Sequence, residues 1–116
     1  MDFEWDPEKS EASLRERGFD FEFATLVFEG PTLEVQDRRQ DDGELRIVAT
    51  GLAEGIALTV VYTDRRTDQG GTVRRIISAR RSNRREHKAY QAAIQEQPEA
   101  RPGRSEPDPP DDRASD

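Results

Sequence analysis

Three stretches in which apolar and polar side chains alternate constrain the fold of this chain more than any other feature. The alternating stretches are residues 45–49, 56–62 and 73–79. A period of two residues is typical of β-strands that bury one face. Short turn-forming segments at residues 41–43, 51–55 and 64–71 suit connections between antiparallel neighbours. With a weaker strand over residues 33–37, the sequence predicts an antiparallel sheet of three to four strands.

Two N-terminal helices are predicted ahead of this sheet. The Asp-Pro-Glu triplet at residues 6–8 combines a capping carboxylate, a proline at the first helical position and an acid facing the positive end of the helix dipole. Gly18 is typical of the left-handed residue after a helix, so the first helix should span about residues 7–17. Asp20 can cap a second helix, which the Gly-Pro pair at residues 30–31 should end.

A last helix is predicted after the sheet. Asn83 and Glu86 have the spacing of a capping box, in which each side chain accepts a hydrogen bond from the other residue's amide. Gln97 and Pro98 should end this helix. The order helix, helix, three or four strands, helix places the chain in the α+β class.

Proline is concentrated at the C-terminal end of this chain of 116 residues. Five of the seven prolines fall within residues 98–116, among charged residues and serine. Such a segment buries too little apolar surface to offset its ordering entropy, so a disordered acidic tail is predicted there. Residues 1–97 should then form a single domain around one thin core.

Composition excludes several classes of protein. Without cysteine, the chain can have neither a disulfide framework nor a thiolate metal site. The start is acidic where a secretion signal would be basic and then apolar. The longest apolar stretch, residues 56–62, is too short to span a bilayer. We therefore expect a soluble cytoplasmic protein.

Most enzyme signatures are missing as well. The sequence has no glycine-rich phosphate loop of the P-loop or dinucleotide type, and Gly70-Gly71 is typical of a turn. His87 is the only histidine, which rules out a two-histidine metal site, and we expect it to be solvated. The acids within residues 2–22 are interpreted as helix caps and exposed faces. The sequence therefore predicts neither a cofactor nor a metal.

Charge is distributed very unevenly along a chain whose formal net charge is −7. Residues 65–88 carry nine Lys or Arg against two acids, a local charge of +7. Residues 1–30 carry nine acids against three bases, a local charge of −6. A basic segment of this size can capture polyanions even when the whole chain is acidic.

The end of the last predicted strand is the best candidate for an anion site. Arg80 and Arg81 lie where the strand ends, and Arg84 and Arg85 lie in the first turn of the following helix. Guanidinium groups and the amides of a helix start can hold a phosphate together. Strict alternation gives two faces, with Arg74, Ile76, Ser78 and Arg80 on one and Arg75, Ile77, Ala79 and Arg81 on the other. The alternative is a solvated basic face, or ion pairs with the acidic N-terminal third.

Segments spread over about residues 3–90 match a known pattern. They are Phe3-Glu4-Trp5-Asp6-Pro7-Glu8-Lys9, Gly18 with Phe21, Val27-Phe28, Glu44-Leu45-Arg46, Val60-Val61-Tyr62-Thr63, and Arg75-Ile76-Ile77-Ser78-Ala79-Arg80 followed by Glu86 and Tyr90. Together they resemble the BrnT family of toxins. The resemblance implies a type II toxin–antitoxin system whose toxin is a small RelE-like ribonuclease, cleaving RNA without metal and slowing translation. It also implies a ribbon-helix-helix antitoxin, BrnA, which covers the toxin and represses their operon in complex with it.

Two departures from the family pattern bear on activity. Family members commonly have Lys-His-Gly at the end of the first helix, where this chain has Glu16-Arg17-Gly18. An Asn usual in that helix is Ser13 here. Arg17 can hold a phosphate, but an arginine side chain does not exchange its proton near neutral pH. If the family histidine acts as an acid or base, this chain would be weakened or inactive.

Metal-free RNA cleavage needs a base for the 2′-hydroxyl, cations for the charge that builds on the phosphate, and an acid for the leaving oxygen. We assign the phosphate charge to Arg46 and Arg80, and consider Lys9 and Glu44 for proton transfer. The predicted RNA-binding residues are Arg17, Arg75, Arg81, Arg84 and Arg85. Lys9 could instead pair with helix acids, and Glu44 with Arg46 could be a cross-strand pair.

Two functions without catalysis are also compatible with the sequence. A homologue that has lost cleavage could still bind antitoxin as a co-repressor, which Arg17 in place of the family histidine favours. A plain single-stranded RNA binder would need exposed aromatic side chains among the basic residues, and only Tyr90 qualifies. Expression without antitoxin discriminates the enzyme from the co-repressor, because only the enzyme arrests growth.

Overall fold

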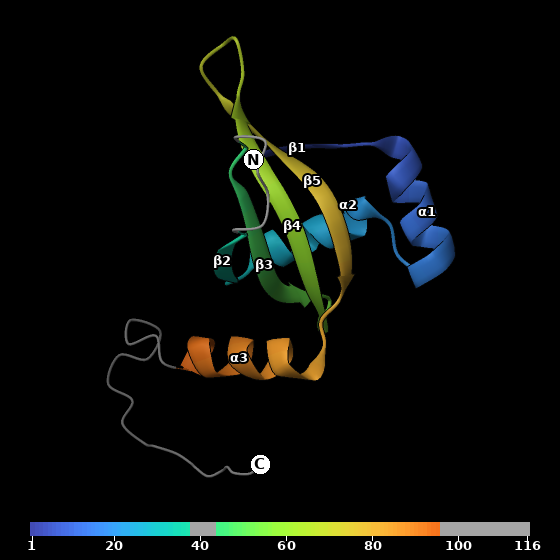
Figure 1. The fold of residues 1–116 in the computed structure, drawn as a ribbon, viewed down its shortest axis with the longest axis vertical. Coiled ribbons are helices and arrows are strands. Elements are labelled where there is room, and N and C mark those ends of the chain that lie inside the picture. Colours follow the sequence, from blue (N-terminus) through green and yellow to red (C-terminus); the bar gives the residue numbers. More distant parts are fainter. Residues whose placement is uncertain (38–43, 96–116) are drawn as a thin grey trace.

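The computed structural model describes residues 1–37 and 44–95, which form one five-stranded sheet with helices at both ends of the chain (Figure 1). The elements are β1 (Asp2–Trp5), α1 (Pro7–Arg17), α2 (Phe21–Ala24), the 3-10 helix η1 (Thr25–Glu29), β2 (Leu33–Asp37), β3 (Arg46–Ala53), β4 (Ile56–Arg66), β5 (Thr72–Arg81) and α3 (Arg84–Gln95). The α+β class and the four predicted strands are confirmed. No helix within the described residues is both long enough and apolar enough to cross a membrane.

Some predictions fall on parts of the chain that lie outside the described residues. These are the turn at residues 41–43, the end of the last helix at Gln97 and Pro98, and the tail over residues 98–116. The division into a domain over residues 1–97 and a separate tail stays a prediction for the same reason.

β1 differs from the prediction, which placed no strand before the first helix. It pairs in parallel with β5, so that Glu4 lies opposite Arg75 and Trp5 opposite Ile76. The sheet, in the order β1-β5-β4-β3-β2, is therefore mixed and five-stranded, not antiparallel with three to four strands. A segment this short has too little periodicity to indicate a strand. Its extended conformation depends on the free edge that β5 offers for pairing.

α1 begins and ends where predicted. The Asp6 carboxylate accepts a hydrogen bond from the Glu8 amide at 2.9 Å, and Pro7 lies in the first turn. Gly18 has a φ of 90°, in the left-handed region that favours glycine, and its amide donates to the Leu14 carbonyl at 3.1 Å. Local capping chemistry therefore sets both ends of this helix.

Two buried serines join α1 to the segment that follows it. The Ser13 hydroxyl donates to the Phe19 carbonyl at 2.6 Å, and the Ser10 hydroxyl accepts from the Phe21 amide at 3.0 Å. A buried carbonyl or amide is costly unless it is hydrogen-bonded. These bonds therefore hold the loop from Gly18 onward against α1.

The second predicted helix divides into two parts. α2 is a single turn capped by Asp20, whose carboxylate accepts from the Phe23 amide at 2.9 Å. η1 continues to Glu29 as a 3-10 helix. Val27 of η1 packs on β3 at Gly51, where a Cβ atom would lie 3.1 Å from the Val27 Cβ. Glycine at this position therefore allows η1 to approach the sheet closely.

The hydrophobic core lies between the sheet and the N-terminal helices. Its buried side chains are Phe19, Phe21, Ala24 and Val27 from the helical segment, with Ala49, Ala53, Leu58, Val60, Tyr62, Ile76 and Ala79 from the strands. We call this side of the sheet the helix-covered face. Thr59, Val61 and Thr63 alternate with the core residues of β4, and we call their side the outer face.

A β-bulge in β5 changes the face on which each later side chain lies. Val61 of β4 pairs with Ser78, but Tyr62 pairs with Ile76, so Ile77 is an extra residue in β5. The extra residue returns Ala79 to the same face as Ile76, and both belong to the core. Strict alternation would have placed them on opposite faces.

The predicted faces of the arginines are therefore wrong beyond the bulge. Arg80 pairs with Thr59 and joins Arg75 on the outer face. Arg81 pairs with the core residue Leu58 and joins Arg74 on the helix-covered face. Two neighbours in the chain thus point away from each other at the end of β5.

The capping box at the start of α3 is confirmed. The Asn83 side chain accepts from the Glu86 amide at 2.8 Å, and the Glu86 carboxylate accepts from the Asn83 amide at 2.9 Å. α3 contacts β2 and β3, and the Tyr90 hydroxyl donates to the Pro31 carbonyl at 3.1 Å. Tyr90 is buried, with 5% of its surface exposed, so it cannot serve as an exposed base-stacking aromatic.

Candidate functional site

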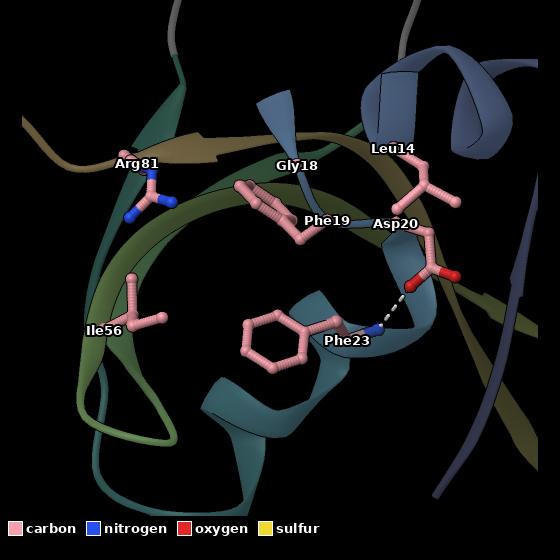
Figure 2. Close-up of a pocket in the computed structure, with 7 residues that line it drawn as sticks. All are labelled: Leu14, Gly18, Phe19, Asp20, Phe23, Ile56 and Arg81. Atoms are coloured by element: carbon pink, nitrogen blue, oxygen red, sulfur yellow. Dashed lines mark hydrogen bonds between the residues drawn. The ribbon is translucent and has the colours of Figure 1, made fainter. Parts of the chain in front are cut away.

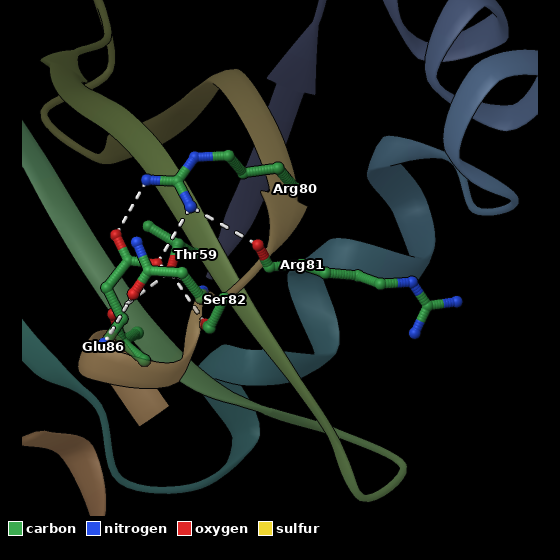
Figure 3. A network of polar contacts seen from close by, with 7 residues as sticks. Thr59, Arg80, Arg81, Ser82 and Glu86 are labelled. Carbon is green, nitrogen blue, oxygen red and sulfur yellow. Dashed lines mark hydrogen bonds and ion pairs between the residues drawn. The ribbon is translucent and has the colours of Figure 1, made fainter. Parts of the chain in front are cut away.

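Arg80 makes a bidentate ion pair with Glu86 where β5 meets α3 (Figure 3). The two hydrogen bonds measure 2.9 and 2.8 Å. The same carboxylate accepts from the Thr59 hydroxyl at 3.1 Å, and Thr59 lies 2.8 Å from the Ser82 hydroxyl. Glu86 therefore links the sheet, the strand end and the helix cap.

The electrostatics of this pair favour two charged partners. The hydrogen bonds from Arg80, together with those from the Asn83 amide and Thr59, lower the pKa of Glu86 to about 2. The hydrogen bonds to Glu86 raise the pKa of Arg80. Glu86 is consequently ionised at neutral pH and carries no proton to give, while its charge offsets that of Arg80.

Arg81 extends in a different direction from Arg80 (Figure 3). Its guanidinium lines a cavity of about 290 Å³ between the α1–α2 loop, the start of β4 and the end of β5 (Figure 2). Most of the other lining side chains are apolar: Leu14, Phe19, Phe23 and Ile56, with Asp20 as the second charged group. Among the described residues, no carboxylate forms an ion pair with Arg81.

Two arginines on the outer face share a carboxylate of β1. Arg65 donates to Glu4 at 2.6 and 2.9 Å, and Arg75 donates to the same oxygen at 3.5 Å. The hydrogen bonds from Arg65 lower the pKa of Glu4, and Arg75 adds to the effect. The predicted alternative, ion pairing with the acidic N-terminal third, therefore describes these two residues.

Arg74 is enclosed by aromatic rings on the helix-covered face. Its guanidinium carbon lies 3.9 Å from the centroid of Tyr62 and 4.9 Å from that of Phe28. Asp64 accepts two hydrogen bonds from it, at 2.8 and 2.9 Å. Burial and a hydrogen bond to Glu34 raise the pKa of Tyr62 to about 12. This arginine supports the fold and is not available to a ligand.

The four residues assigned to catalysis do not lie together. Arg46 begins β3 and approaches Glu44 at 3.4 Å, which is a contact along one segment and not a cross-strand pair. Arg80 is level with Thr50 of β3, because Thr59 pairs with both. Arg46 lies four residues from Thr50, which is roughly 13 Å along β3. Arg80 is on β5, and β4 lies between β3 and β5 in the sheet. Lys9 is exposed on α1, on the other side of the sheet.

Three further predicted RNA-binding residues are exposed. Arg84 and Arg85 lie in the first turn of α3, and Arg17 lies in the last turn of α1. None of the three forms an ion pair with a carboxylate in the part of the chain that the structure describes. We call Arg80, Arg81, Arg84 and Arg85 the β5–α3 corner. His87, expected to be solvated, is partly buried.

The cavity beside Arg81 was not indicated by any motif. Its lining comes from the end of α1, the loop to α2, the start of β4 and the end of β5. Phe19 belongs to the core and Phe23 packs against it, and only the bulge at Ile77 directs Arg81 toward them. The ion pair between Arg80 and Glu86 was not predicted. The place of Glu86 in the capping box was predicted, because it follows from the spacing of Asn83 and Glu86 alone.

Comparison with protein families supplies one match. Residues 5–86 match the model of a family described as a ribonuclease toxin, BrnT, of a type II toxin-antitoxin system. The matched segment includes β1's last residue, all four following strands, Arg80 and Glu86. No curated protein matches the chain in a sequence search.

Proposed function

Since the chain belongs to the BrnT family of ribonuclease toxins of type II toxin–antitoxin systems, we propose that it cleaves RNA, inhibits translation, and engages its substrate at the β5–α3 corner. The observation that supports this location is the distribution of ion pairs. Arg65, Arg74 and Arg75 are held by carboxylates, whereas Arg81, Arg84 and Arg85 have none among the described residues. A phosphate chain binds where cationic charge is not already neutralised.

The chemistry assigned to this corner is stabilisation of the charge that builds on the scissile phosphate. Arg80 lies at the end of β5, one residue before Arg81 and four before Arg84, and is ionised at any pH at which RNA is stable. Its second role is to hold Glu86, so a phosphate must either share the guanidinium with Glu86 or replace it. Lys9 and Glu44 remain the proposed groups for proton transfer, and Arg46 a proposed phosphate contact at a more distant nucleotide.

The reaction is proposed to need no metal, because a base, an acid and the guanidinium groups can supply all three roles. Cleavage of single-stranded RNA by the purified chain should therefore persist in excess EDTA. Loss of cleavage that added magnesium restores would contradict this part of the proposal.

The proposed partner is a ribbon-helix-helix antitoxin similar to BrnA, which would bind operator DNA within a hetero-oligomer. Membership of a type II family supports a protein antitoxin. A small neighbouring reading frame should encode such a protein, and co-expression should relieve growth arrest. A RelE-like fold stays part of this proposal.

The experiment that tests the site compares two variants that both break the same ion pair. Arg80→Ala removes the cation, and we expect it to reduce RNA cleavage by about 10²-fold or more, as for loss of one charge-stabilising donor. Glu86→Gln leaves the cation in place and should retain most of the cleavage. Both should show a native circular dichroism spectrum.

Equal loss of cleavage in the two variants would remove Arg80 from the reaction. In that case, its role would be to hold Glu86 and α3. Toxicity in cells that express each variant without antitoxin should follow the same order as cleavage.

A second function, antitoxin binding without cleavage, is favoured by two observations. Lys9, the Glu44–Arg46 pair and Arg80 come from three separate parts of the molecule, and Arg17 replaces the histidine common in the family. The chain would then be a co-repressor whose expression leaves cells unaffected. Arg17→His discriminates the two functions, since a gain of RNA cleavage that depends on pH near neutrality would identify the missing proton-transfer group.

A further inference from the structure

The cavity at the start of β4 and the end of β5 presents aromatic and aliphatic walls to solvent. The rings of Phe19 and Phe23 lie 6.0 Å apart between their centroids, and Phe23 is only partly buried (Figure 2). Leu14, with 51% of its surface exposed, and Ile56 complete the rim. A planar group that stacks on an aromatic ring would remove this apolar surface from water.

Two opposite charges lie on different sides of the same cavity. Arg81 lies on the side of Ile56, and Asp20 lies on the side of Leu14 (Figure 2). One oxygen of Asp20 accepts the hydrogen bond that caps α2, at 2.9 Å from the Phe23 amide. A carboxylate has about four lone-pair sites, so Asp20 keeps acceptor capacity for a ligand.

We propose that this cavity binds one nucleotide of the RNA substrate, with the base stacked on Phe23, the base edge donating to Asp20 and the phosphate held by Arg81. The inference rests on the proposed function and adds a base preference to it. The cavity adjoins the β5–α3 corner through Arg81, which belongs to both.

Guanine fits the acceptor at Asp20 better than the other bases. Its Watson–Crick edge presents two adjacent donors, N1–H and the N2 amino group, which suit a carboxylate. Cytosine and adenine present one amino donor beside a ring acceptor. Uracil presents a single N–H between two carbonyl oxygens, which a carboxylate repels. The expected order of affinity is guanine, then cytosine and adenine, then uracil.

Charge complementarity favours a nucleotide over an antitoxin segment in this cavity. An apolar side chain followed by an acid would suit the walls and Arg81, but its carboxylate would meet the charge of Asp20. A nucleotide satisfies both groups, since its anion and its donors are at opposite ends. Binding of the antitoxin to this cavity would shift the methyl signals of Leu14 and Ile56, so the experiment also measures it.

The test uses the full chain with carbon-13 labels in the leucine and isoleucine methyl groups, titrated with guanosine 5′-monophosphate and with uridine 5′-monophosphate. The Leu14 and Ile56 methyl signals should shift with the guanine nucleotide. The uracil nucleotide should bind about tenfold more weakly, the discrimination expected of one bidentate base contact.

Two pairs of variants assign the polar contacts. Asp20→Asn keeps a good helix cap, so it should remove the preference for guanine without unfolding α2. Asp6→Asn makes the same change at the cap of α1, outside the cavity, and should leave the preference intact. Arg81→Gln should bind guanosine 5′-monophosphate no more tightly than guanosine, because the phosphate contact is lost. Arg66→Gln, at the distant end of β4, should keep the wild-type affinity for the mononucleotide.

The outcomes separate this inference from the proposed function when cleavage is measured on the same samples. RNA cleavage without methyl shifts, or equal binding of the two nucleotides, overturns the cavity assignment and leaves the ribonuclease standing. Methyl shifts with guanine preference but no cleavage support the cavity and contradict the ribonuclease. If the antitoxin shifts the Leu14 and Ile56 signals and the nucleotides do not, the cavity is a protein-docking site and the inference is wrong.

Discussion

Arg80 and Arg81 are adjacent in the chain, yet their side chains have different chemical surroundings. Arg80 makes two hydrogen bonds to Glu86 on the outer face, whereas Arg81 lines an apolar cavity on the helix-covered face. A bidentate pair already occupies the fork of donors through which an arginine binds an anion. At the scale of single residues, the ion-pair partner of an arginine, and not its position in the chain, decides whether it is available to an anion.

The ion pair at Glu86 predicts a dependence of stability on pH. The pKa of Glu86 is about 2 in the folded chain, below the ordinary value of 4.5. As pH falls from neutral, the unfolded chain therefore binds a proton at Glu86 before the folded chain does. The stabilisation is fully present above about pH 4.5 and is lost as the pH falls toward 2.

Glu86→Gln keeps the capping hydrogen bond but removes the charge. Its urea midpoint should lie below that of wild type near pH 7, and the difference should narrow steadily below about pH 4.5. Repeating the comparison in an Arg80→Gln background should shrink the difference at every pH. A gap that is constant from neutral to acid pH would show that the ion pair does not stabilise the fold.

At the scale of elements, close packing between η1 and the sheet depends on one position. Val27 of η1 rests on Gly51 of β3, and the bulge at Ile77 brings Ala79 back to the core beside Ile76. Both features follow from the need to bury one continuous face, because a one-residue slip would turn buried side chains toward water. The strand register is therefore set by packing.

Gly51→Ala should destabilise the chain through contact with η1. The added Cβ would lie 3.1 Å from both the Val27 Cβ and the Thr32 Cγ2, and 3.3 Å from the Val27 carbonyl oxygen. Overpacking of this kind costs about 1–3 kcal/mol, which the free energy of unfolding in urea would measure.

Gly30→Ala is the matched control for that substitution. Its φ of −126° is available to any residue, and no atom beyond Gly30 and its two chain neighbours lies within 4 Å of the added Cβ. Its free energy of unfolding should stay within about 0.5 kcal/mol of wild type. Equal changes in the free energy of unfolding for the two substitutions would mean that the close contact between η1 and Gly51 does not limit the side chain at residue 51.

At the scale of the whole molecule, β1 brings part of the acidic N-terminal third to the basic strands. Glu4 of β1 holds Arg65 and Arg75, two of the nine basic residues within 65–88. Near the end of β5, Arg81, Arg84 and Arg85 have no carboxylate partner among the described residues, although the chain as a whole has a net charge of −7. Binding of RNA should therefore be local and dependent on salt.

The salt dependence of RNA binding provides a quantitative check. Each phosphate of a single-stranded RNA that the protein neutralises releases counterions. In a plot of log affinity against log salt concentration, each such phosphate adds about 0.7 to the magnitude of the slope. Replacing Arg81, Arg84 and Arg85 together by Gln should reduce the magnitude of that slope by about 2. Fluorescence anisotropy of a labelled RNA over a range of KCl concentrations measures it.

Arg65→Gln is the control for this measurement, because Arg65 is already paired with Glu4. Its slope should change far less than that of the triple variant. A triple variant with the wild-type slope would place the RNA elsewhere on the surface.

Features set by interactions between residues close in the chain were predicted correctly, whereas a feature set by residues far apart in the chain was missed. The cap at Asp6, the left-handed Gly18 and the box of Asn83 with Glu86 involve partners within a few residues, so the sequence alone indicates them. The strand stretches were predictable because alternation is also local. β1 was missed because its conformation depends on pairing with β5, which no short-range pattern records.

The amino-acid sequence by itself determined the α+β class, the ends of α1, the start of α3 and a cluster of arginines where β5 meets α3, since each follows from neighbouring residues. Only the tertiary structure decided what those arginines do. The bulge at Ile77 directs Arg81 toward the cavity lined by Phe19 and Phe23. The packing of α3 against the sheet brings Glu86 into its ion pair with Arg80. Both outcomes arise from burying a shared core between segments distant in the chain, which selects one register and one set of partners from many that local chemistry allows.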